Sequence, residues 1–184
     1  MKKLLAILIV AATLFATTNT DSAFAQTEEE DIVLGAGLTF GSGVGAAGLD
    51  NDLGIRVDGY YTVTPEIRAG ADFTFYFPAS EGDVDLTVWE LNFNGNYIFL
   101  EEDGLMVYGI GGINITGLTV DTPEQSFGGQ TFGGSSSISE FDLNLGEGAE
   151  YALDFANLFG ELKLGGLGGD ADQFVLGAGL RFPI

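Results

Sequence analysis

Apolar and polar residues alternate with a period of two in eight segments of this chain. The clearest segment is 66–77, EIRAGADFTFYF, where the odd-numbered positions are apolar and the even-numbered positions are polar or glycine. Such alternation is typical of an extended strand with one apolar and one polar face. The pattern recurs, with varying clarity, over residues 32–40, 53–63, 86–99, 105–117, 140–153, 158–166 and 173–182. None of these segments has a helical period, so the sequence predicts an all-β domain.

The connections between the eight segments alternate in length. The second, fourth and sixth are tight turns, at 64–65, 100–104 and 154–157. The first, third, fifth and seventh are longer, at 41–52, 78–85, 121–139 and 165–172. A meander that crosses a membrane has short turns on one side and long loops on the other, and an even strand number lets the sheet close without an edge. We therefore expect an eight-stranded antiparallel up-and-down transmembrane β-barrel.

The basic residues indicate which face of this barrel is polar and enclosed. Beyond residue 25 the chain has four of them, and all four lie on the polar faces of the predicted strands, together with seven acids. Buried acids need partners, and an eight-stranded barrel is just wide enough for side chains to fill its interior. The interior is thus predicted to hold an ionic network of Arg56, Asp58, Glu66, Arg68, Asp72, Glu90, Asp142, Glu150, Glu161, Lys163 and Arg181.

The apolar faces then point outward into lipid. Several aromatic residues lie near strand ends, where the interfacial girdles of membrane barrels belong. The expected lipid-facing and girdle residues are Tyr61, Phe73, Phe75, Phe77, Trp89, Phe93, Tyr97, Phe99 and Phe182. Glu147 does not fit, because it falls on the predicted outer face. Either a bulge shifts the register there, or the residue lies above the hydrocarbon, or the alternation is misread locally.

The N-terminus has the three parts of a secretory signal peptide. Lys2 and Lys3 precede an apolar run over residues 4–16, and a polar stretch ends in the small-x-small sequence at 23–25. The apolar run is shorter than the roughly 20 residues that a transmembrane helix needs. We expect residues 1–25 to be a signal peptide and residues 26–184 to form one barrel domain.

Charge and composition exclude several classes of function. Without residues 1–25 the chain keeps four of its six basic and 26 of its 27 acidic residues, a net charge of −22 that repels nucleic acid. The absence of histidine and cysteine excludes Ser-His-Asp and Cys-His sites, the usual zinc ligand sets and disulfides. Luminal carboxylate pairs are better explained as a structural network. We therefore expect no catalytic, cofactor-binding or metal-binding residue.

Four stretches carry a diffuse resemblance: VYGIGGIN at 107–114, DLNLGEGAEYAL at 142–153, LFGELKLG at 158–165 and FVLGAGLRF at 174–182. With the signal peptide, they resemble the small eight-stranded proteins of the outer-membrane β-barrel domain family, which includes OmpX-like and opacity-like proteins. The resemblance implies a bacterial outer membrane, both termini in the periplasm, and contacts with outer-membrane lipids and the barrel-assembly machinery. That machinery is thought to read a terminal aromatic residue; Phe182 matches, although Pro183 and Ile184 follow it.

The functional expectation is a non-enzymatic, monomeric barrel with a filled lumen, serving envelope structure or surface interaction. The longest connection, 121–139, is the expected contact surface, with Phe127 and Phe132 as its anchors. The sequence identifies no surface partner. A narrow channel for small solutes is the alternative, and a secreted lipocalin-like binder with its apolar face inside is the third interpretation.

Overall fold

The computed structural model describes residues 32–42, 53–128, 130–167 and 173–184. The signal peptide predicted at 1–25 lies outside the described residues. The described strands are β1 (Ile32–Ser42), β2 (Leu53–Thr64), β3 (Ile67–Tyr76), β4 (Ala79–Glu81), β5 (Val84–Glu102), β6 (Leu105–Phe127), β7 (Gln130–Ala152), β8 (Asn157–Leu167) and β9 (Gln173–Pro183). No helix within these ranges is long and apolar enough to cross a membrane.

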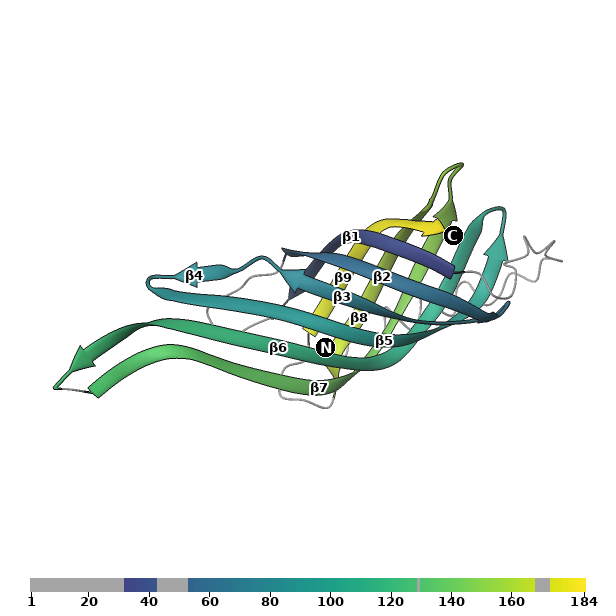
Figure 1. The fold of residues 1–184 in the computed structure, drawn as a ribbon. Coiled ribbons are helices and arrows are strands. Elements are labelled where there is room, and N and C mark those ends of the chain that lie inside the picture. The colour runs from purple at the N-terminus through teal and green to yellow at the C-terminus, as the bar shows by residue number, and fades with distance from the viewer. Residues whose placement is uncertain (1–31, 43–52, 129, 168–172) are drawn as a thin grey trace.

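The strands form one closed antiparallel barrel (Figure 1). Apart from β3 and β4, strands that follow one another in sequence pair with each other. In addition β3 pairs with β5, and β9 closes the ring on β1. The short β4 continues β3 along the edge of β5, so the wall built by the described residues has eight strands. The predicted all-β, eight-stranded up-and-down barrel is therefore confirmed. The C-terminal tail extends the closing seam, because the Ile184 amide donates to the Ile32 carbonyl over 2.9 Å.

The two ends of the barrel differ in the length of their connections. The β2–β3, β5–β6 and β7–β8 turns lie at one end (Figure 1), and the β5–β6 turn is made by Asp103 and Gly104, both with positive φ. At the other end β6 and β7 continue as a long paired hairpin. The prediction of a loop over 121–139 was therefore wrong for most of its length. Serine and threonine are compatible with strands once a partner strand supplies the backbone hydrogen bonds.

Side chains alternate strictly between the interior and the outer surface. In β2 every second residue from Gly54 to Thr62 is buried, and the residues between them are apolar except for Gly59, which is also on the outer face. The outer surface accordingly carries large exposed apolar residues, such as Leu38, Val57 and Leu145, each at least 56% exposed. A lipocalin-like binder needs the opposite arrangement, so the structure excludes the third interpretation.

Glycine on the inner face makes room for the large side chains that fill the barrel. A Cβ atom at Gly148 would come within 2.6 Å of the Tyr108 ring, and one at Gly70 within 2.6 Å of the Tyr60 ring. A Cβ at Gly35 would lie 2.8 Å from the Arg181 side chain. Because real Cβ atoms do not approach so closely, these three positions are restricted to glycine by the interior packing.

We predict that charge on the outer face destabilises the barrel according to its depth. Val57 lies midway along the outer face of β2, and Val63 lies beside the β2–β3 turn. Val57→Arg should lower the free energy of unfolding in lipid vesicles by about 2–4 kcal/mol, because a base near the bilayer midplane is poorly solvated. Val63→Arg, the matched control near the interface, should cost about 0–1 kcal/mol. Equal costs at the two positions would contradict the assignment of the outer face to lipid.

Candidate luminal network

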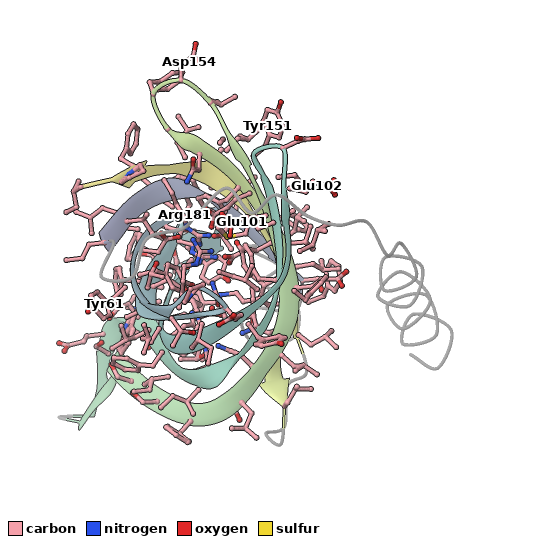
Figure 2. The ribbon with its side chains drawn as sticks, turned by 90° about the vertical axis from the view of Figure 1, so that its right-hand side faces the viewer. Tyr61, Glu101, Glu102, Tyr151, Asp154 and Arg181 are labelled. Atoms are coloured by element: carbon pink, nitrogen blue, oxygen red, sulfur yellow. The ribbon has the colours of Figure 1, made fainter. Side chains whose placement is uncertain are left out.

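Arg181 of β9 is the centre of the polar interior, and its side chain is fully buried. Its Nε and Nη2 donate to the two carboxylate oxygens of Asp58, each over 3.0 Å. Nη2 also donates to Glu161 over 2.7 Å, and Nη1 donates to Tyr108 and to Glu150. Figure 2 shows Arg181 within the ring of strands, where one guanidinium joins residues of β2, β6, β7 and β8.

A second layer forms around Arg56 of β2. Its guanidinium pairs with Glu161, with Asp58 over 3.2 Å and with Asp72 over 3.3 Å. Lys163 of β8 contacts the same oxygen of Asp72, with Nζ 3.2 Å from Oδ2. Because Asp58 and Glu161 contact both Arg56 and Arg181, the two layers share their carboxylates and form one continuous network.

Arg68 of β3 completes the ionic set near the short-turn end. Its Nη2 and Nη1 donate to the two oxygens of Glu150, over 2.6 and 3.3 Å. This forked geometry suits a guanidinium and a carboxylate, and the other contact of Glu150 joins it to Arg181. In the described structure, four bases thus meet four acids: Asp58, Asp72, Glu150 and Glu161. Equal numbers of opposite charges reduce the otherwise large cost of burying ions.

Aromatic rings fill the space between the guanidinium groups. The Arg181 guanidinium carbon lies 4.2 Å from the Phe159 ring centroid and 4.6 Å from that of Tyr60. Arg68 lies 5.0 Å from the centroid of Tyr108. The sequence analysis missed these three rings as parts of the interior. Tyr60 and Phe159 alternate in step with the charged residues of β2 and β8, and Tyr108 is in step with Asn114 of β6. This alternation was the signal that could have identified them.

Amide side chains line the interior between the ionic layers and the end of the barrel with the long hairpin. Asn92 and Asn94 of β5 donate to Asp72 over 2.8 and 2.7 Å, and Asn114 and Asn144 both donate to Asn92 over 2.7 Å. Glu90 lies beyond them, and it accepts hydrogen bonds from Gln173 over 2.7 Å and from Tyr76 over 3.3 Å. Leu86 and Val88 then pack against Tyr76 at the end with the long hairpin. Buried side chains thus follow one another along the interior from Arg68 to Leu86.

The structure places most, but not all, of the expected luminal residues inside. Asp142 is buried on the inner face of β7. Glu90 is also buried, with hydrogen bonds from Gln173 and Tyr76 and the electrostatic attraction of Lys163. The prediction that Glu66 lies in the lumen was wrong. Its side chain is exposed in the β2–β3 turn, where it accepts a hydrogen bond from Thr64. A register shift between Thr62 and Thr64 interrupts the alternation just before this turn.

The expected outer residues lie on the outer face of the wall. Figure 2 shows Tyr61 at the periphery, and Phe73 stacks on Trp89 with ring centroids 6.2 Å apart. The other expected girdle residues, Phe77, Phe93, Tyr97, Phe99 and Phe182, are exposed, and Phe75 is partly exposed. The backbones of Phe127 and Phe132 pair within the β6–β7 hairpin, but their side chains lie outside the described part of the structure.

Glu147 remains on the outer face. It lies between Gly146 and Gly148, whose Cβ atoms would point at Lys163 and Tyr108 inside the barrel. The register shift of β7 against β8 is between Leu143 and Leu145, and the alternation continues unbroken from there through Glu147. A bulge therefore does not turn this carboxylate inward.

The chemistry of the interior is that of a closed structural network. Its ion-paired carboxylates each bind a guanidinium or an ammonium group, which leaves them poorly placed to activate water or a substrate. No group of three or more acidic side chains in the described ranges is arranged to hold a metal ion.

No protein-family model matches the sequence, and no curated protein sequence does either. Solved structures do share the fold. Neisserial surface protein A (NspA) is 18% identical, with a TM-score of 0.60 over 82% of this chain and 96% of that one. Ail, the attachment invasion locus protein of Yersinia pestis, is 19% identical, with a TM-score of 0.55 over 84% of this chain and all of that one. The N-terminal barrel of Pseudomonas aeruginosa OprF is 14% identical, with a TM-score of 0.53 over 85% of this chain and 98% of that one. The fold is that of the small eight-stranded outer-membrane barrels.

We predict that the network is sensitive to loss of its central base. Arg181→Met leaves Asp58, Glu150 and Glu161 with fewer partners in a dry interior, so the free energy of unfolding in lipid vesicles should fall by about 3–5 kcal/mol. Lys163→Met is the matched control, because Asp72 keeps Arg56 and two amide donors. Its loss should be clearly smaller. A control variant as unstable as Arg181→Met would show that the network has no centre at Arg181.

Proposed function

We propose that this chain is a non-enzymatic, monomeric barrel of the bacterial outer membrane that serves envelope structure or surface interaction. The observation that carries the proposal is the combination of an exposed apolar outer wall with ion pairs buried inside the barrel. Outer-membrane lipids would surround the wall, and the barrel-assembly machinery would insert it. The short turns and both chain ends would face the periplasm, since β1 begins and β9 ends at that end of the barrel (Figure 1).

The β6–β7 hairpin is the part of the described structure best placed to contact a partner. Its two strands remain paired up to Phe127 and Gln130, far beyond the barrel wall (Figure 1). The hairpin carries Asp121, Glu124 and a run of exposed serines over 135–137. Residues held in paired strands lose less conformational freedom on binding than residues in an unpaired loop of the same length.

The charge distribution restricts the class of surface partner. A structure of Ail has been solved in complex with the heparin analogue sucrose octasulfate. In this chain the four bases beyond residue 25 are all buried in the lumen, so none is available to bind sulfate groups at the surface. Neutral or basic partners are therefore favoured over nucleic acids and sulfated polysaccharides.

The proposed topology is tested by labelling engineered cysteines, which is clean because the chain has none. Ser136 is exposed on the long hairpin, and Asp154 is exposed in the β7–β8 turn (Figure 2). In intact cells a membrane-impermeant maleimide should label Ser136→Cys, and it should label Asp154→Cys only after the outer membrane is permeabilised. Labelling of both, or of Asp154→Cys alone, in intact cells would overturn the proposed orientation.

The channel alternative makes the opposite prediction about conductance. Ion pairs, rings and amides lie inside the barrel from Arg68 to Glu90. On the proposed function they would fill the lumen, and the refolded barrel should give no steady openings in planar bilayers. The N-terminal barrel of OprF, recorded in the same bilayers, gives a reference of the same fold. Steady openings from this chain at single-molecule insertion would favour a channel for small solutes over a filled barrel.

A further inference from the structure

Glu147 is an acid on the lipid-facing wall. It faces outward from β7, and its neighbours across the sheet are Gly109 of β6 and Leu162 of β8. Among the described residues none forms a hydrogen bond or an ion pair with its carboxylate. The residue is thus a charged group in an apolar surface with no partner supplied by its own barrel.

Its depth places it inside the hydrocarbon rather than at the interface. On the outer face of β7, Glu147 lies between Phe141 and Tyr151, both exposed aromatic residues. With a rise of about 3.3 Å per residue and a strand tilt of about 40°, it is about 15 Å from the level of Phe141 and about 10 Å from that of Tyr151. An ionisable group at such a depth is strongly disfavoured without a partner and points to a functional contact.

The surface beside Glu147 is bare backbone. Cβ atoms placed at Gly109, Gly111 and Gly160 would meet nothing within 4 Å, so open space borders the carboxylate on both sides. Small residues let another backbone approach closely within a membrane. We call Gly109, Gly111, Glu147, Gly160 and Leu162 the Glu147 face.

A second copy of this chain does not supply the missing charge. The four bases beyond residue 25 are buried in the lumen of each barrel, so two copies would bring two carboxylates together. Lipid amines lie at the membrane surface, well away from this depth. A base of a different protein embedded in the same membrane would supply the complementary charge.

We propose that the Glu147 face is a lateral docking site for another membrane protein, whose transmembrane segment carries a lysine or arginine at mid-bilayer depth. The proposal rests on the outer-membrane location proposed above. Charge complementarity selects the partner, and the bare glycine surface lets the two backbones come close enough for the ion pair to form away from lipid.

Site-specific photocrosslinking in the cell's own outer membrane tests this proposal. A benzoylphenylalanine replaces Leu162 of β8, which pairs with Glu147, and the matched control replaces Val57 at the middle of β2, three strands away around the ring. We expect an adduct with a different protein at position 162 and none at position 57. The peptide of the captured protein that carries the crosslink should come from a transmembrane segment with a lysine or arginine.

Two outward substitutions identify the feature that binds. Glu147→Gln removes the charge and keeps the shape, while Gly109→Leu keeps the charge and fills the open surface. Each should lower the adduct yield at least tenfold, with folding verified by the heat-modifiable mobility of the barrel on gels. An unchanged yield in Glu147→Gln, an adduct between two copies, a contact peptide without a base, or equal yields at positions 162 and 57 would overturn the proposal.

The labelling of Ser136→Cys and Asp154→Cys in the same membranes distinguishes a failure of the proposed topology from a failure of the docking proposal. If the labelling pattern holds while the crosslink fails, only the docking proposal is lost. If the labelling pattern itself fails, the proposed orientation is lost, and the crosslinking still tests the docking proposal, which does not depend on which end of the barrel faces outward.

Discussion

The structure depends on the pairing of its four buried bases with carboxylates in a ring of eight strands. Such a ring is just wide enough for side chains inside it, so each buried base needs a carboxylate from the wall. Arg181 meets this constraint by contacting three carboxylates from three different strands. The network therefore ties β2, β7, β8 and β9 together across the lumen, in addition to the backbone pairing around it.

The same constraint accounts for the outer surface. Because all four bases are used inside, the exterior beyond residue 25 carries acids without any compensating lysine or arginine. This distribution favours neutral or basic partners at the hairpin. It also leaves Glu147 as an unpaired acid on the outer face of β7, between the levels of Phe141 and Tyr151. The burial of all four positive charges thus bears on three features: the ionic lumen, the class of partner favoured at the hairpin, and the lack of a base beside Glu147.

Period-two alternation was enough to predict the strands, the barrel and which face of each strand points inward. It failed where the chain departs from regular pairing, as at Glu66, which follows a register shift and lies in a turn. It also could not show that 121–139 continues as strands, because serine and glycine signal loops unless a partner strand is present. Which acid meets Arg181 was beyond the sequence, because partners such as Asp58 and Arg181, 123 residues apart, are brought together only by the register and tilt of the closed barrel.

The most direct test of the ion-paired lumen is magic-angle-spinning NMR of the protein in lipid bilayers, with arginine side-chain nitrogens and carboxylate carbons labelled. The account predicts through-space correlations from the Arg181 guanidinium to the carboxylates of Asp58, Glu150 and Glu161. Correlations of that guanidinium with lipid phosphorus or with bulk water, and with none of the three carboxylates, would contradict it.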